Sequence, residues 1–173
     1  MKIVVIFDQG LAGLGGKSNL DLALTIQKGS VGTGLILDKH FEKINAKIIA
    51  TLSCGINTFN KDKENTVLKL CAMIKKINPD FVLAGPCFDF KDYALMCAMT
   101  CKLLKDQNYV KVVSMMASEN NEIIENFAGD IDIIKMPKKG GTGLNDSLAD
   151  LCEYLKNQND NEKLAKLKEK ICY

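Results

Sequence analysis

The sequence lacks tryptophan, has few aromatic residues (6%) and contains three prolines and a single histidine, His40. Its 173 residues carry a net charge of only +2. A charge this small creates no strong field for nucleic acid or a membrane surface, and few rings are present to stack on bases. We therefore expect no nucleic-acid partner and no membrane partner.

Long apolar runs are also missing. No stretch approaches the ~20 apolar residues of a membrane-spanning helix, and the first residues are typical of a strand rather than of a signal peptide. The seven cysteines include no Cys-x-x-Cys pair, and several stand in apolar stretches. This pattern fits free thiols in a reducing compartment better than a disulfide framework, so we expect a cytoplasmic protein.

Metal-binding patterns are weak as well. Cys97 and Cys101 stand four residues apart in a helical pattern, but two thiols without further ligands make a poor zinc site. His40 lies in a region of uncertain structure and suggests no Cys–His pair. We expect no metal and no cofactor.

Five short, nearly continuous apolar runs are present, and such runs predict strands that are buried on both faces. They span residues 2–7, 47–53, 80–85, 110–116 and 130–136. Apolar residues at helical spacing lie between and after them and predict helices over 63–77, 91–106, 142–157 and 159–171.

Strands that alternate with helices indicate an α/β fold with a three-layer α/β/α arrangement. We expect a mainly parallel five-stranded sheet, flavodoxin-like or Rossmann-like, with strand order 2-1-3-4-5. Residues 1–158 should form the α/β substrate-binding-type domain, and residues 159–173 a charged C-terminal helix packed on it. The glycine-rich stretch 8–46 should be an extended loop with one short helix, and long structured loops usually serve function.

The loop after the first strand contains Gly16-Lys17-Ser18, the ending of a nucleotide-binding loop. That loop also needs a glycine at position 11, where this chain has Leu11. The dinucleotide pattern G-x-G-x-x-G fails too, because position 18 is Ser18. We do not interpret this loop as a nucleotide site.

Polar residues and glycines follow all five expected strands, and the carboxyl ends of parallel strands are where α/β proteins bind ligands. Any one such loop could need these residues only for its turns, but five loops at one edge favour a pocket. The runs that follow the strands are Asp8-Gln9, Ser53 to Phe59, Gly85 to Asp89, Ser118 to Asn121 and Lys138 to Gly143.

The last of these loops, Gly140-Gly141-Thr142-Gly143, directly precedes a helix. Free backbone N–H groups at a helix N-terminus could bind a carboxylate or phosphate. The alternative is an ordinary loop in which Thr142 or Asn145 caps the helix, and we favour this slightly.

Cys54 and Cys87 are expected at the same sheet edge, after adjacent strands. A thiolate near a helix N-terminus can have a lowered pKa, which would make either residue a candidate catalytic nucleophile. The alternative is that both thiols are buried and inert.

The loop motifs together resemble a known family. They are Gly13-x-Gly15-Gly16, Lys28-Gly29-x-Val31-Gly32-x-Gly34, Cys54-Gly55-x-Asn57-x-Phe59, Pro79-Asp80, Ala84-Gly85-Pro86-x-Phe88 with Tyr93 and Cys97, and Glu119-Asn120. Over roughly residues 1–140 the chain is similar to the N-terminal half of the selenoprotein subunit of component B in the glycine, sarcosine and betaine reductases, with D-proline reductase as a relative.

The resemblance implies a substrate-binding role for residues of these loops. They are Gln9, Gly13, Gly15, Gly16, Gly55, Asn57, Phe59, Gly85, Pro86, Phe88, Tyr93, Glu119 and Asn120. The family's selenocysteine lies in a C-terminal half that has no counterpart here, so the chain would be at most a component of an amino-acid reductase. Ile56 replaces a usual Asp, and the run Asp89 to Ala94 lacks the family's Arg, which removes a plausible carboxylate clamp.

Three functions follow from the sequence. The first is a stand-alone reductase component that binds a small amino-acid-like or carboxylate ligand and works with other reductase subunits. The second is an independent cysteine-dependent enzyme acting on a small acid or amine, and the third is a non-catalytic ligand-binding or assembly module. We expect a homo-oligomer under any of them, because the missing half would leave surface uncovered.

Overall fold

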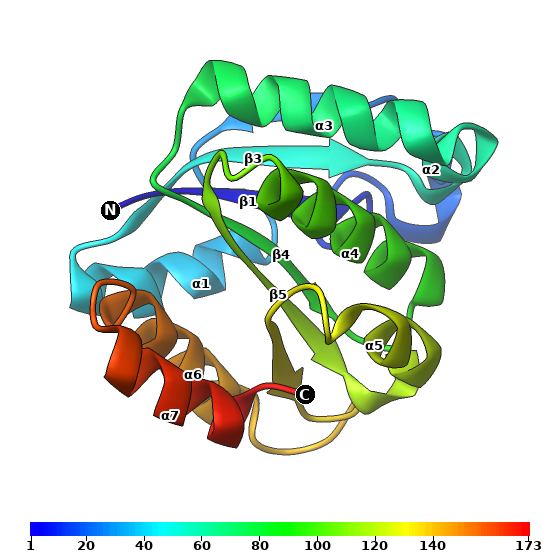
Figure 1. Ribbon diagram of the computed structural model, residues 1–173. Helices are drawn as coiled ribbons and strands as arrows, with labels where there is room; N and C mark the ends of the chain where they lie inside the picture. The colour runs from blue at the N-terminus through cyan, green and yellow to red at the C-terminus, as the bar shows by residue number, and fades with distance from the viewer.

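The chain folds around one six-stranded sheet with helices on both faces (Figure 1). The computed structural model describes residues 1–173 with the exception of the Lys17 side chain. The spatial order of the strands is β2-β3-β1-β4-β5-β6. Their bounds are β1 Lys2–Asp8, β2 Thr25–Lys28, β3 Lys47–Cys54, β4 Phe81–Cys87, β5 Lys111–Ala117 and β6 Ile133–Met136.

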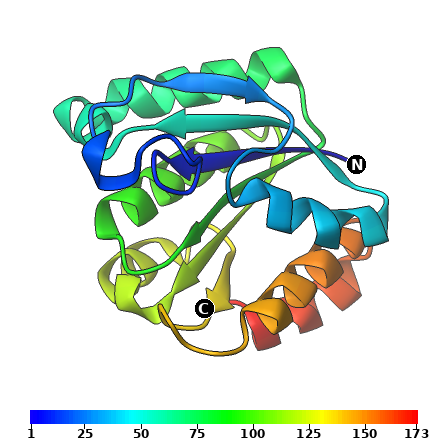
Figure 2. The ribbon, with the colours of Figure 1, turned by 180° about the vertical axis from the view of Figure 1, so that it is seen from behind.

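Helices form the two outer layers. In Figure 1, α3 and α4 lie in front of the sheet, and Figure 2 shows α1 and α6 on the opposite face. The helices are α1 Gly34–Phe41, α2 Ile56–Lys61, α3 Lys63–Ile77, α4 Lys91–Asp106, α5 Asn121–Phe127, α6 Leu144–Lys156 and α7 Asn161–Ile171, with short 3₁₀ turns η1 Gly16–Ser18, η2 Glu42–Ile44 and η3 Ser118–Asn120.

The three-layer α/β fold and the order of its parallel strands are confirmed. The parallel pairs are β1 with β3, β1 with β4, β4 with β5 and β5 with β6. Numbered among themselves, these five strands have the predicted order 2-1-3-4-5.

The strand count was wrong, because the sheet has six strands rather than five. The additional strand, β2, lies within the stretch 8–46 and pairs antiparallel with β3 at the edge of the sheet. Its sequence, Thr-Ile-Gln-Lys, contains one apolar residue, and Ile26 is exposed, so it presents no buried apolar run. No helix was predicted over residues 56–61 and 121–127, which form the short helices α2 and α5.

Each face of the sheet carries its own hydrophobic core, because successive strand residues point to opposite faces. Val4 and Ile6 of β1 face the layer of α2 to α5, where they pack in one cluster with Leu70 of α3. Phe7 faces the other layer and packs with Phe41 of α1. Full burial of one such side chain stabilises the fold by roughly 1.5–3 kcal/mol.

The C-terminal segment packs on the second of these cores. Leu164 and Leu167 of α7 lie against the cluster that contains Phe7. Asp160 caps α7 by accepting a hydrogen bond from the Lys163 N–H at 3.1 Å. Beyond the helix, the Tyr173 N–H donates to the Ile133 carbonyl at the start of β6.

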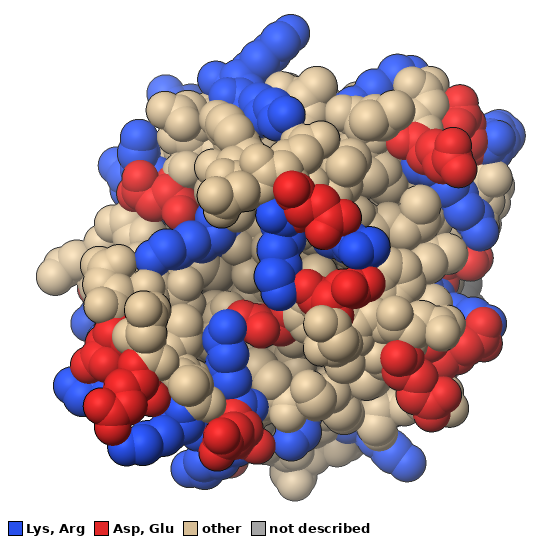
Figure 3. All heavy atoms as spheres, in the orientation of Figure 1, with Lys and Arg blue, Asp and Glu red and all other residues tan. Residues whose placement is uncertain are grey.

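Basic and acidic side chains are interspersed over the face seen in Figure 3, where neither sign forms a large continuous patch. This distribution agrees with the small net charge of the sequence. Among the residues that the structure describes, none of the helices combines the length and apolar character needed to cross a membrane.

Candidate functional site

A crevice of about 490 Å³ opens at the carboxyl ends of β1 and β4. These two strands are neighbours, and the chain connections leave β1 toward β3 on one side and β4 toward β5 on the other. Such a reversal of strand order is where open α/β sheets bind ligands. The lining residues are Asp8, Gln9, Gly10, Leu11, Gly16, Pro86, Phe88, Asp89, Phe90, Tyr93 and Lys139.

The crevice combines charges of both signs with aromatic surface. Asp8 is buried and accepts a hydrogen bond from the Leu11 N–H at 2.7 Å, whereas Asp89 is exposed. Burial raises the pKa of Asp8, and hydrogen bonds from backbone N–H groups partly offset this effect. Among the side chains that the structure describes, Lys139 is the one cation in the lining.

Close backbone contacts help to hold the loop that follows β1. A Cβ atom at Gly55 would lie 2.3 Å from the Leu20 carbonyl oxygen, so only glycine fits there. The Gly55 N–H donates to the Leu22 carbonyl at 2.9 Å. Gly32 has φ +52° and supports the same loop from the other side, where a Cβ would lie 2.1 Å from the Leu11 carbonyl oxygen.

The end of β4 forms a second wall of the crevice, and a glycine again allows a close backbone approach there. Gly85 has φ +127°, and a Cβ atom there would lie 2.7 Å from the Met115 carbonyl oxygen of β5. Asn120 is buried and donates from Nδ2 to the Phe88 carbonyl at 2.6 Å and to the carbonyls of Cys87 and Ala117 at 3.2 Å each. Asn120 therefore fastens the end of β4 to the end of β5.

The loop after β6, which contributes Lys139, forms a third wall of the crevice, and Glu119 positions it. Its Oε1 accepts a hydrogen bond from the Lys139 backbone N–H at 3.0 Å, which ties the loop after β6 to the end of β5. The side chain of Lys139 is left to line the crevice. Glu119 thus acts on the crevice through Lys139 and is not itself part of the lining.

These glycine-framed loops lie in a part of the chain that matches a known family. The family model for glycine/sarcosine/betaine reductase selenoprotein B matches residues 1–172. The chain belongs to this family. No solved structure matches the chain.

Curated relatives in the selenoprotein B family carry the names of reductase subunits. The glycine reductase complex component B subunit gamma of Symbiobacterium thermophilum is 31% identical over 120 residues, which cover 69% of this chain and 28% of the relative. The sarcosine reductase complex component B subunit beta of Peptoclostridium acidaminophilum is 29% identical over 167 residues, 96% of this chain and 35% of the relative. The betaine reductase complex component B subunit beta of the same organism is 29% identical over 119 residues, 69% of this chain and 27% of the relative. The chain therefore spans about a third of the length of these relatives.

The predicted substrate-binding residues divide into those that line the crevice and those that lie outside its lining. Gln9, Gly16, Pro86, Phe88 and Tyr93 are in the lining. Gln9 and Tyr93 also hold the frame, since Gln9 Oε1 accepts from the Ile56 N–H and the Tyr93 hydroxyl donates to the Ile6 carbonyl at 2.7 Å. The other predicted binding residues lie outside the lining: Gly13, Gly15, Gly55, Asn57, Phe59, Gly85, Glu119 and Asn120.

Asn57 and Phe59 belong to α2, where they have structural contacts. The Asn57 amide donates to the Asp21 carboxylate at 3.2 Å, and Phe59 is fully buried in the core. Gly13 and Gly15 have positive φ angles in the loop after β1. The side chain of Lys17, in the Gly16-Lys17-Ser18 stretch, lies outside the described residues.

Cys54 and Cys87 are both fully buried, and neither lines the crevice. They are the last residues of β3 and β4. The prediction that these strands are adjacent was wrong, because β1 lies between them. Burial raises the pKa of Cys54 to about 11, so proximity to the short helix α2 does not lower it. A protonated, inaccessible thiol is a poor nucleophile.

The loop Gly140-Gly141-Thr142-Gly143 is exposed and lies outside the crevice lining. The prediction that Thr142 or Asn145 caps α6 was wrong, because the N-cap is Gly143, with φ +100° and no side-chain cap. A residue in this backbone conformation is best supplied by glycine. Asp146 places a carboxylate in the first turn, where an incoming anion would have to bind.

Three charged residues of the lining were not chosen as binding residues from the sequence: Asp8, Asp89 and Lys139. Asp8 is the last residue of β1, and Asp89 and Lys139 stand in the loops that follow β4 and β6. Their position at the ends of strands was the signal available in the sequence. Among the described residues, no group of three or more His, Cys, Asp or Glu side chains is arranged to hold a metal ion.

Proposed function

We propose that this chain is a ligand-binding component of an amino-acid reductase and that its crevice binds a small amino-acid-like or carboxylate ligand. The observation that carries this proposal is the position of the crevice at the strand-order reversal, in a chain that the selenoprotein B family model matches over residues 1–172. We further propose that the chain works beside other reductase subunits, because its relatives are named as subunits of reductase complexes.

The charges of the lining support a zwitterionic ligand. Lys139 can pair with a carboxylate, while Asp89 and the ionised form of Asp8 can pair with an amine. The rings of Phe88, Phe90 and Tyr93 offer apolar surface and can also attract a cation. Since Lys139 is a point charge rather than a planar fork, a carboxylate would be held mainly by charge.

A cysteine-dependent enzyme has less support. Cys54 and Cys87 are fully buried, and neither belongs to the crevice. A ligand in the crevice would therefore meet carboxylates, an ammonium group and rings, but no thiol. The features of the crevice favour binding over nucleophilic attack by this chain.

Calorimetric titration and thermal-shift measurements with glycine, sarcosine, betaine, proline and small carboxylates test the proposal. We expect at least one amino-acid-like compound to bind, and Lys139→Gln to weaken that binding about tenfold, since a hydrogen bond to a charged group contributes roughly 1.5–3 kcal/mol. Asp89→Asn should weaken binding of the amine-containing compounds and leave a simple carboxylate less affected.

Lys138→Gln is the matched control, because Lys138 is the exposed neighbour of Lys139 and does not line the crevice. It should bind like the wild type. Failure of every amino-acid-like and carboxylate compound to bind, or equal losses in both lysine variants, would count against the proposal. Self-association remains a prediction, which light scattering coupled to size-exclusion chromatography measures directly.

A further inference from the structure

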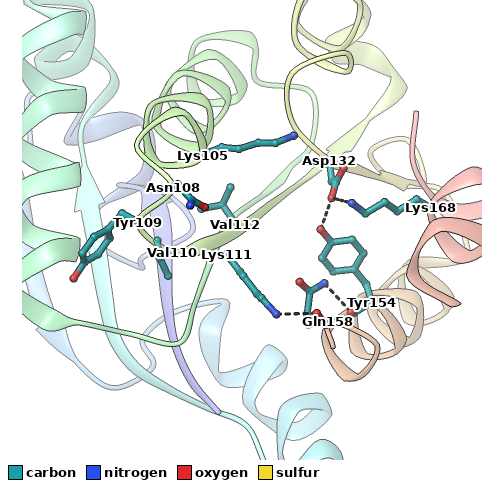
Figure 4. Close-up of a pocket in the computed structure, with 10 residues that line it drawn as sticks. All are labelled: Lys105, Asn108, Tyr109, Val110, Lys111, Val112, Asp132, Tyr154, Gln158 and Lys168. Atoms are coloured by element: carbon teal, nitrogen blue, oxygen red, sulfur yellow. Dashed lines mark hydrogen bonds and ion pairs between the residues drawn. The ribbon is translucent and has the colours of Figure 1, made fainter. Parts of the chain in front are cut away.

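A second hollow, of about 310 Å³, lies at the opposite edge of the sheet from the crevice (Figure 4). One wall is the turn from α4 into β5, with Lys105, Asn108 and Tyr109 through Val112. The other wall brings together Asp132 before β6, Tyr154 of α6, Gln158 and Lys168 of α7. Because it borders the first residues of β5 rather than its last, it is separated from the crevice by roughly the 20 Å length of that strand.

The lining has an excess of positive charge. It contains three lysines, Lys105, Lys111 and Lys168, and a single acid, Asp132. The negative charge of Asp132 is already balanced, because its carboxylate forms an ion pair with Lys168 and accepts a hydrogen bond from the Tyr154 hydroxyl. Among the described residues, no carboxylate lies within ion-pair distance of Lys105 or Lys111.

Both of these ammonium groups are nevertheless held in place by neutral oxygens. Lys105 Nζ donates to the Asp130 carbonyl at 2.6 Å. Lys111 Nζ donates to the Gln158 carbonyl at 2.8 Å and to Asn159 Oδ1 at 3.1 Å. An ammonium group has three N–H donors, so Lys105 keeps two for another partner and Lys111 keeps one.

Apolar surface accompanies these charges. Val110, Val112 and the ring of Tyr154 belong to the same lining, and Figure 4 shows the Tyr154 ring between Asp132 and Gln158. Positioned cations with unused donors beside apolar groups are what a small organic anion requires, and the volume lies at the lower end of the range for ligand pockets.

We propose that this hollow, here called the β5 anion pocket, binds a small organic dianion, a phosphate ester or a dicarboxylate, between Lys105, Lys111 and Lys168. The site is independent of the crevice and of the function proposed for it. Since lysines recognise charge rather than planar shape, the pocket should tolerate either anionic group. Asp132 limits the affinity, because it competes with the ligand for Lys168.

Calorimetric titration with inorganic phosphate and with malonate, at one fixed low ionic strength, tests the proposal and distinguishes the two anionic groups. We expect at least one probe to bind, and Lys105→Gln and Lys111→Gln each to weaken it about tenfold. Asp132→Asn should tighten binding several-fold, since it frees Lys168 and removes a negative charge. A merely structural role for these lysines would not produce that gain.

Lys166→Gln provides the matched control, because Lys166 lies on the same helix as Lys168, pairs with Glu162 and is not in the lining. It should bind both probes like the wild type, and circular dichroism melts verify that each variant is folded. Absence of binding by both probes overturns the proposal. Binding that is insensitive to Lys105→Gln and Lys111→Gln, or that Asp132→Asn fails to tighten, also overturns it.

Discussion

At the scale of single residues, Asp8 lines the crevice although its carboxyl group is buried, and burial disfavours the charged form. Its pKa is raised above the ordinary value of 3.8 because burial disfavours the carboxylate. Between 3.8 and the folded-state pKa, the folded protein therefore binds more protons than the unfolded chain does. The free energy of unfolding falls as the pH rises through that window, and the loss is complete above it.

We predict that Asp8→Asn makes the protein at least as stable as the wild type at pH 7 while weakening the binding of amine ligands. The amide oxygen of the new side chain can still accept the Leu11 N–H, and the cost of a buried charge disappears. Denaturant unfolding of both proteins from pH 3 to pH 7 measures the effect. The stability gain should grow with pH, and a variant that is less stable than the wild type at pH 7 would contradict this account.

At the scale of elements, the end of β4 depends on Asn120, the last residue of η3 and the N-cap of α5. Three carbonyl oxygens surround its amide group, so a donor is required at that position. We predict that Asn120→Asp lowers the free energy of unfolding by roughly 3 kcal/mol, because a buried carboxylate would face acceptors alone.

Urea unfolding monitored by circular dichroism measures this loss. Asn121→Asp is the control, since Asn121 is exposed and its charge would lie in the first turn of α5, where the helix dipole favours an acid. It should change stability by less than about 0.5 kcal/mol. Equal effects of the two substitutions would argue against a special role for the amide of Asn120.

The sequence predicted elements well where burial or periodicity was strong. Helices α3 and α4 have the predicted bounds, 63–77 and 91–106, because each is long enough to show an apolar stripe. The last strand, β6, begins at Ile133 rather than at residue 130, after the polar residues Asp130 and Asp132. Strand β2 and the helices α2 and α5 were missed, since they are too short or too polar to carry a period and depend on tertiary contacts.

The site was predictable as an edge of the sheet but only partly as a set of residues. Polar residues and glycines after the strands indicated the edge at which the crevice lies, and Gln9, Pro86 and Phe88 are in its lining. Their predicted role in substrate binding stays a prediction. Gly55 was assigned to ligand contact, whereas it is needed for close approach to Leu20. A glycine that is needed because another backbone segment passes close by cannot be distinguished in a sequence from a glycine that leaves room for a ligand.

At the scale of the whole molecule, the thiols lie almost entirely inside. Six of the seven cysteines are buried, and Cys172 is half-buried. Burial raises the pKa of Cys71 to about 11, as it does for Cys54, and that of Cys172 to about 12. At pH 8 only about one in a thousand Cys54 thiols would be ionised.

We predict that the folded protein reacts slowly with a chromogenic disulfide reagent at pH 8, with Cys172 reacting first because it is the most accessible. In guanidinium chloride, all seven thiols should react at once, which provides the control for intact cysteines. Mass spectrometry of partially labelled protein identifies the order. Rapid modification of Cys54 or Cys87 that a crevice ligand prevents would favour the cysteine-dependent enzyme instead.

The close approaches at Gly32, Gly55 and Gly85 have an evolutionary consequence. Because main chain contacts main chain at these points, this part of the crevice walls does not depend on the side chains that project into the crevice. Asp89 and Lys139, which are exposed, can therefore be exchanged by drift or by design without rebuilding the scaffold. One scaffold of this kind can serve a lineage of proteins with different ligands, and a library confined to those two positions would sample that diversity.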